Sequence, residues 1–257
     1  VTGMQGAAVG NIILEASKAI QIGGLFSYSK KSIGLQMSSI INIADKVETG
    51  QVAIFVNKAK VVNGFQIGLI NISDTITGTP IGLLNLVESG YNRIQIAGHQ
   101  DGLQATLGLK LGTKRFYNIF QTGIRVDNFV QRNDGGTTTT IDHVPAWGIG
   151  YGLGTAVTLN NRFLVNLEVT ATHIHERTFW TKELNLLNQV HLTLDARLGN
   201  RISLFVGPTL NIMMSKLYNP ETLEFGSAIA GKTFVNETST NGVNAKMWLG
   251  ISGGIRF

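Results

Sequence analysis

The segment His173-Ile-His175-Glu176 brings together side chains of the types that bind zinc or act as general bases. On a strand, His173 and His175 share one face, so both imidazoles could reach one metal ion. A base here could instead act on lipid, as in barrel enzymes that modify lipopolysaccharide. However, no Ser or Asp partner is identifiable, and the register of the two histidines faces the membrane. We therefore predict an interfacial belt with Trp180, and no catalytic residue, metal or cofactor.

A second group of polar side chains falls on the inward face of the predicted strands. Buried charges must be paired, so a group of mixed sign predicts a polar network that holds the interior of a barrel together. The functional alternative is a path for protons or ions. We favour the structural reading for these residues, which are Arg93, Lys110, Arg125, Glu168, His191, Asp195, Arg197 and Arg256.

The elements that carry these side chains are segments in which apolar residues alternate with polar or small ones. Leu107 and Leu109, for example, alternate with Gly108 and Lys110. A period of two predicts strands, and these lengths suit membrane strands of about 9–11 residues. An apolar outer face around a polar lumen predicts an eight-stranded antiparallel transmembrane β-barrel over residues 91–257. The predicted strands are 93–100, 103–111, 116–127, 146–159, 163–175, 185–198, 202–216 and 245–257, with a bulge at Pro208.

The lengths of the connections support a bacterial outer-membrane barrel. Connections after the second, fourth and sixth strands are short, whereas those after the third, fifth and seventh are long, at 128–145, 176–184 and 217–244. Such barrels have short periplasmic turns and long external loops. An even number of strands then places both ends of the barrel on the periplasmic side. The tip Gly135-Gly136 and the connection 217–244 are candidates for external contacts.

The chain ends in Ile255-Arg256-Phe257. This ending is similar to the C-terminal signal of outer-membrane barrels, in which a final aromatic residue follows alternating apolar positions. The resemblance implies that Phe257 is recognised by the outer-membrane assembly machinery. It also implies contacts with outer-membrane lipids and lipopolysaccharide.

Residues 1–90 contain a repeat. Units begin at Gln5, Gln21, Gln36, Gln51, Gln66 and Pro80, at spacings of 16, 15, 15, 15 and 14 residues, and five of the six end in Asn. One unit is too short to bury its own apolar strand, but stacked units form a continuous core, so the repeat predicts a short β-solenoid of about six repeats. Stacking predicts a hydrogen-bonded ladder of Asn42, Asn57, Asn71 and Asn85.

The segments Gly64-Phe-Gln-Ile-Gly-Leu-Ile-Asn-Ile-Ser-Asp74 and Ile81-Gly-Leu-Leu-Asn85 resemble a family of surface-repeat outer-membrane proteins of Bacteroidetes and spirochaetes. The repeats of that family read like Gln-Ile-Gly-Leu-Ile-Asn. The resemblance covers about a third of the chain. It implies a location in the cell envelope and no defined activity.

Composition excludes several other classes. Twenty-one basic residues face 16 acidic ones without a dense basic run, which argues against nucleic-acid binding. There is no cysteine for disulfides or thiolate metal sites, and no apolar run of about 18 residues that would form a transmembrane helix.

We expect a non-enzymatic outer-membrane barrel with its solenoid on the periplasmic side, a structural or accessory subunit of an envelope complex with a protein partner. The alternatives are an enzyme that modifies lipid A or phospholipid, and a small passive channel.

Overall fold

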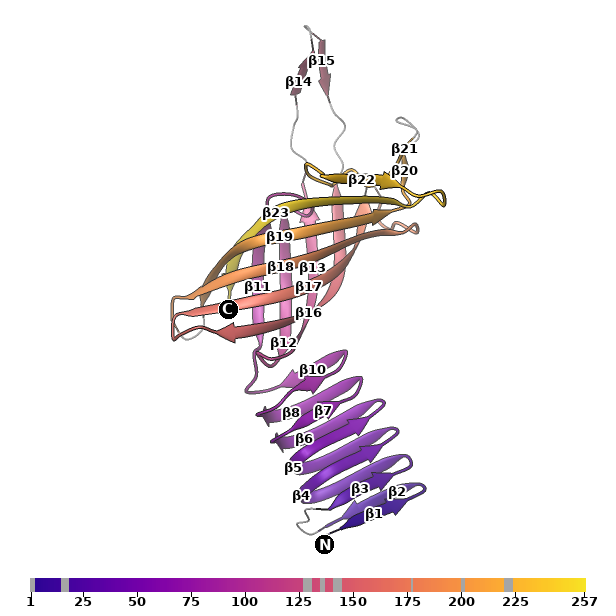
Figure 1. Ribbon diagram of the computed structural model, residues 1–257, viewed down its shortest axis with the longest axis vertical. Helices are drawn as coiled ribbons and strands as arrows, with labels where there is room; N and C mark the ends of the chain where they lie inside the picture. Colours follow the sequence, from indigo (N-terminus) through magenta and orange to yellow (C-terminus); the bar gives the residue numbers. More distant parts are fainter. Residues whose placement is uncertain are drawn as a thin grey trace. The chain divides into compact units, whose positions relative to one another are not determined.

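The computed structural model describes residues 3–14, 19–126, 131–134, 137–140, 145–176, 178–199, 202–219 and 224–257. Within these ranges the fold is all-β, with a closed eight-stranded antiparallel barrel and a β-solenoid of about five turns, which confirms the predicted fold class (Figure 1). No helix in the described part of the chain is long and apolar enough to cross a membrane. Two compact units are present. The first comprises Val1–Arg93, Lys110–Asn118 and Gly154–Ala156, and the second comprises the remaining residues.

The solenoid is built from parallel strands that pair from one coil to the next. These strands are β1 (Met4–Ala7), β2 (Gly10–Ile13), β3 (Ile20–Gly23), β4 (Phe26–Ser38), β5 (Ile41–Ala53), β6 (Val56–Val62), β7 (Phe65–Ile67), β8 (Ile70–Ile76), β9 (Pro80–Ile81) and β10 (Leu84–Val87).

Each coil of the solenoid has three sides. The side that carries the repeat glutamines pairs Gln36 with Gln51 and Gln51 with Gln66, and we call it the Gln side. After a corner, the Asn side pairs Asn42 with Asn57. A third, shorter side then pairs residues 46–47 with 61–62 and leads back to the Gln side of the next coil.

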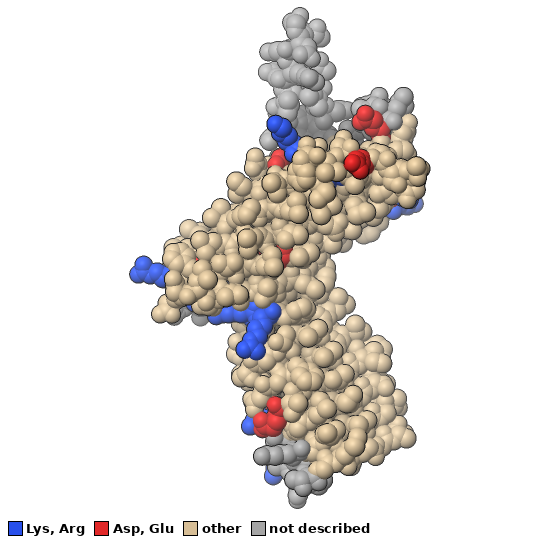
Figure 2. Space-filling view, viewed as in Figure 1, with Lys and Arg blue, Asp and Glu red and all other residues tan. Residues whose placement is uncertain are grey.

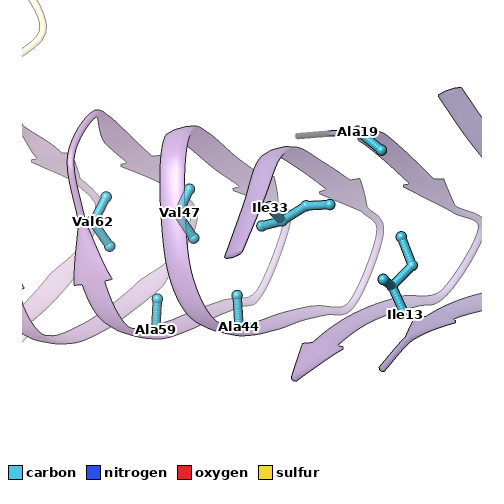
Figure 3. Packing of buried hydrophobic residues seen from close by; sticks show 7 residues of the cluster. All are labelled: Ile13, Ala19, Ile33, Ala44, Val47, Ala59 and Val62. Atoms are coloured by element: carbon cyan, nitrogen blue, oxygen red, sulfur yellow. The ribbon is translucent and has the colours of Figure 1, made fainter. Parts of the chain in front are cut away.

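The apolar core of the solenoid is narrow. Small and β-branched side chains fill it, since a coil of about 15 residues leaves little internal space. The buried cluster contains Ile13, Ala19, Ile33, Ala44, Val47, Ala59 and Val62, with Ile76 packed against it (Figure 3). The remaining interior is occupied by the amide side chains of the repeats.

The barrel strands pair in the order β11-β12-β13-β16-β17-β18-β19-β23, and β11 pairs with β23 to close the barrel. Main-chain bonds in both directions between Ile94 and Phe257, 3.2 and 2.9 Å long, extend this closing seam. The strands are β11 (Arg93–His99), β12 (Ala105–Gly112), β13 (Tyr117–Arg125), β16 (Ala146–Thr158), β17 (Phe163–Glu176), β18 (Asn185–Arg197), β19 (Ser203–Ser215) and β23 (Asn244–Arg256).

The long connections carry short strands of their own. A two-stranded ribbon forms from β14 (Gln131–Asp134) and β15 (Thr137–Thr140), and another from β20 (Tyr218–Asn219) and β21 (Glu224–Phe225). A further strand, β22 (Val235–Thr238), pairs with the start of β23. The predicted tip Gly135-Gly136 lies outside the described residues.

The predicted bulge at Pro208 is wrong. Pairing of β19 with β23 runs without a shift from Ser203↔Arg256 to Ser215↔Asn244. Pairing with β18 keeps one register on both sides of the proline, at His191↔Thr209 and Leu194↔Val206, and is interrupted only between these pairs. Pro208 therefore removes one donor from the ladder without inserting a residue.

Candidate functional site

The inward faces of β17, β18 and β23 bring three of the predicted lumen residues together. Arg256 is fully buried, and its guanidinium lies 2.5 Å from the carboxylate of Asp195 and 3.4 Å from that of Glu168. Gln95 accepts a bond from Nε of Arg256 at 2.7 Å, and the guanidinium also lies over the ring of Phe205, 4.1 Å from its centroid. The guanidinium thus pairs with two buried carboxylates, which is the kind of pairing that buried charges require.

The other predicted lumen residues make further contacts, and His191 is the cross-strand partner of Glu168 in register. In the first compact unit, the ammonium of the fully buried Lys110 is 5.7 Å from the centroid of the Tyr117 ring, and Arg93 lies over Tyr91. In the second unit, His191 packs edge-on against His99. Arg197 is the last residue of β18, where its main-chain N–H donates to Arg162.

Arg125, also predicted as part of the network, instead contacts the long connection between β19 and β23. Its guanidinium donates to the carbonyls of Gly102 and Ile229, both at 3.0 Å. Ile229 belongs to the connection between β19 and β23 and is fully buried. It packs with the buried side chains Leu103, Ala146, Ile174, Leu187, Met213 and Trp248. We call residues 227–230 the plug, because they fill this end of the barrel interior.

One carboxylate fastens the plug to the barrel wall. Glu176, the last residue of β17, accepts bonds from the hydroxyl of Ser227, from the N–H of Ala228 at 3.0 Å and from the amide of Asn185 at 2.9 Å. The ammonium of Lys246 donates to the carbonyl of Ser227 at 2.9 Å. In the sequence, Glu176 follows the two histidines that could bind a metal ion. In the structure, its carboxylate accepts hydrogen bonds from Asn185 and from the plug.

His173 and His175 form an aromatic cluster with Trp147 and Trp180. Nδ1 of His175 accepts the N–H of Thr181, and Nε2 of His173 lies 3.0 Å from the carbonyl of Thr181. The ring of His175 stacks on Trp180 and lies 4.3 Å from the ring of Trp147, measured between centroids. Within the described part of the chain, no group of three His, Cys, Asp or Glu residues is arranged to hold a metal ion.

The outer wall of the barrel is grooved. A groove of about 860 Å³ lies over β12, β13, β16 and β17 and is lined mainly by apolar side chains, including Leu107, Leu109, Phe120, Ile149 and Tyr151. Phe120 and Tyr151 pack edge-to-face across it. The lining includes one imidazole, that of His173, which already lies next to a main-chain carbonyl.

Inside the solenoid, the repeat asparagines form a continuous ladder. The amide of each donates to the side-chain oxygen of the next, from Asn42 to Asn57 at 3.0 Å, to Asn71 at 3.0 Å and to Asn85 at 2.8 Å. All four side chains are fully buried. The ladder continues to Asn118, which lies in the same compact unit and accepts the amide of Asn85 at 2.8 Å.

A second ladder, which the sequence analysis missed, runs along the Gln side. Gln66 donates to Gln51, Gln51 to Gln36 and Gln36 to Gln21, at 2.7–2.8 Å. Its donors point toward the N-terminus, whereas those of the Asn ladder point toward the C-terminus, so the two rows of amide dipoles oppose each other. The recurrence of Gln at the start of five units was the available signal. The next residue in register after Gln66 is Pro80, which has no side-chain amide, so the ladder stops there.

The chain was compared with protein-family models, with curated proteins and with solved structures, and nothing matched in any of the three comparisons.

Proposed function

We propose that this chain is a non-enzymatic integral protein of a bacterial outer membrane, with a structural or accessory role in the envelope. The observation that carries the proposal is the inverted polarity of the barrel. Outward residues such as Leu167, Val169, Leu192, Leu249 and Ile251 are about half exposed or more, whereas the inward neighbours on the same strands are buried and mostly polar. Such a surface suits acyl chains and not water.

The filled interior favours a structural role over a channel. One part of the lumen is occupied by the Arg256, Asp195 and Glu168 group, and the end that carries the long connections is filled by the plug and Trp248. An eight-stranded barrel has an interior just wide enough for side chains. No continuous water path is therefore expected through this barrel.

The orientation follows from strand parity. Arg256 pairs with Gln95 at the start of the barrel and with Ser203, which follows a short connection, so the barrel begins and ends at its short-turn edge. In outer-membrane barrels this edge faces the periplasm. We therefore propose a periplasmic location for the solenoid, which precedes β11 in the chain.

Exposed aromatic side chains support an accessory role with a protein partner. Phe179 is 84% exposed and Phe234 is 60% exposed, and both lie in long connections. Aromatic side chains are enriched in protein interfaces. Nε2 of His173 and Nδ1 of His175 are both engaged by the main chain of Thr181, which argues against a general-base role of these atoms in lipid modification.

The accessory role is tested by affinity isolation of the tagged full chain from outer membranes in mild detergent, followed by mass spectrometry. We expect one protein partner in stoichiometric amount. A double variant, Phe179→Ser with Phe234→Ser, should reduce its recovery, whereas Phe163→Ser, a change to an outward barrel residue at the short-turn edge, should not. Isolation of the chain alone under conditions that preserve other envelope complexes would contradict an accessory role.

A further inference from the structure

The solenoid is apolar on the outside of two of its three sides. On the Asn side, the outward row next to the corner consists of Phe26, Ile41, Val56, Ile70 and Leu84. On the Gln side, one outward row consists of Ile22, Met37, Val52, Ile67 and Ile81. The inward neighbours of these residues are mainly the ladder amides and small residues, with Ala53 beside Val52 and Pro80 beside Ile81. The large apolar side chains of these two sides therefore point outward, which is the reverse of the usual arrangement in a water-soluble protein.

The corner between these two sides is the most exposed apolar part of the solenoid. It carries one large aliphatic side chain per coil, each 45–62% exposed: Leu25, Ile40, Ile54, Leu69 and Leu83. We call this row the ridge. Together with the two flanking sides it forms an apolar surface that runs along the whole solenoid. Figure 2 shows an extended solenoid surface without charged side chains. A continuous apolar surface of this kind indicates a site of interaction.

The main chain at the ridge is already hydrogen-bonded. The N–H groups of the ridge residues Leu25, Ile40, Ile54 and Leu69, and that of Leu84 next to Leu83, each donate to a carbonyl of the preceding coil, at 2.7–3.1 Å. A protein partner could supply bonds to free main-chain groups, but hydrocarbon cannot, so a lipid-facing surface must satisfy them internally. The N–H groups of Leu25, Ile40, Ile54 and Leu69 meet this requirement.

The charged residues gather on the opposite part of each coil. The third side and its two corners carry Lys30, Lys31, Asp45, Lys46, Glu48 and Lys60, and two ion pairs form there, Lys46–Glu48 and Lys60–Asp45, both 2.8 Å long. The hydrogen bond and the charge of Asp45 raise the pKa of Lys60. Along each coil, this third side connects the end of the Asn side to the start of the Gln side of the next coil. It therefore lies opposite the ridge, which is the corner between the Gln side and the Asn side.

Lys58 is the one charged residue in the outward rows of the Asn side, where Ile43 and Ile72 are its neighbours in register. It lies two residues before Lys60 and therefore close to the edge of the charged side. A lysine at this place can lay its alkyl chain along apolar surface and extend its ammonium to a lipid phosphate.

We propose that the ridge and its two flanking sides insert into the acyl-chain layer of a bilayer, with the charged side in water. The proposal rests on the proposed function, since it needs the barrel to hold the chain at a membrane. The solenoid then lies in the interface as an apolar wedge, and lysines near the edges of the wedge meet anionic headgroups. The segregation of charge to the side opposite the ridge favours lipid as the occupant, because it gives the solenoid one apolar face and one charged face.

The absence of cysteine allows a direct test with single nitroxide labels. Leu69→Cys places a label on the ridge, and Thr75→Cys places one on the charged side of the same coil. Leu249→Cys, on the outward face of β23, reports whether the barrel is in the bilayer. Each purified full-length variant is reconstituted into liposomes of phosphatidylethanolamine and phosphatidylglycerol. Electron paramagnetic resonance then measures collisions with oxygen, which concentrates in lipid, and with a water-soluble nickel chelate.

We expect the labels at 69 and 249 to collide several-fold more with oxygen than with the nickel chelate, and the label at 75 to show the opposite preference. If 249 is in lipid but 69 is as accessible to nickel as 75, the wedge is overturned and the barrel stands. If 69 is inaccessible to both reagents and shows spin–spin broadening, a second copy covers the ridge and the wedge is again overturned. If 249 prefers nickel, the proposed membrane function itself fails.

Discussion

The guanidinium of Arg256 neutralises two carboxylates that have almost no contact with solvent. Replacing Arg256 by leucine removes the guanidinium that pairs with the buried carboxylates of Asp195 and Glu168, and loss of one partner of a buried pair costs about 3–5 kcal/mol. We expect Arg256→Leu to lower the free energy of unfolding in urea by this amount, measured in detergent micelles. Arg162→Leu, a change at an exposed turn, should have little effect. A loss below about 1 kcal/mol would show that the network does not stabilise the barrel.

The carboxylate of Glu176 fastens the plug to the barrel wall. Glu176→Ala removes the acceptor for Ser227, Ala228 and Asn185, and hydrogen bonds to charged groups contribute about 1.5–3 kcal/mol each. We expect the plug to open often enough for proteolysis within residues 226–231, detected by mass spectrometry. Glu224→Ala removes an exposed carboxylate of the same connection and should leave the plug resistant. Equal cleavage of both variants would contradict the role of Glu176.

Sequence reasoning placed only those residues whose inward position follows from alternation along a long strand. Alternation along β17, β18 and β23 was enough to place Glu168, Asp195 and Arg256 on one face. The partner of Arg125 is the carbonyl of Ile229, 104 residues away in a long connection without periodicity. No local pattern predicts such a contact, because it depends on how the connection folds back.

Within the solenoid, the repeat glycines lie where the Asn ladder and the adjacent coil leave no space for a side chain. A Cβ on Gly82 would lie 2.1 Å from the carbonyl oxygen of Gly68 and 2.6 Å from the amide nitrogen of Asn71. Overpacking of this kind costs about 1–3 kcal/mol. We therefore expect Gly82→Ala to loosen the last coils, measured as faster amide hydrogen exchange in residues 66–87.

Gly6→Ala is the matched control, since a Cβ at Gly6 has no atom within 4 Å. Its hydrogen exchange should equal that of the unaltered chain. Unchanged exchange in Gly82→Ala as well would mean that the close approach of the coils is not needed. The comparison separates the steric requirement at the corner from the general effect of alanine on a flexible chain.

The elements themselves were largely predictable, for a physical reason. Strands such as β17 and β23 are long and alternate strictly, so their ends fell within one residue of the predicted ones. The repeat gave the solenoid, because Gln and Asn recur at the spacing of one coil. The pattern could not predict which side chains of each repeat point into the solenoid and which point outward. A run such as Gln66-Ile-Gly-Leu-Ile-Asn71 is compatible with either polarity until the ladders place the amides inside.

At the scale of the whole molecule, the filled barrel should not conduct. We expect planar-bilayer recordings of the purified chain to show no steady current, because side chains and the plug occupy the lumen. Deletion of residues 226–231 removes the plug and should leave conductance low, since the Arg256 group still fills the lumen. A stable open state in the unaltered chain would support the channel alternative.

Residence of the barrel in the outer membrane is tested most directly by extraction of separated envelopes. Outer and inner membranes are resolved on a density gradient, and the outer-membrane fraction is washed with alkaline carbonate, which releases peripheral proteins. For an integral outer-membrane barrel, we expect the chain to stay in the outer-membrane pellet and to migrate as a compact form on an unheated detergent gel. Release into the carbonate supernatant, or recovery with soluble periplasmic proteins, would contradict it.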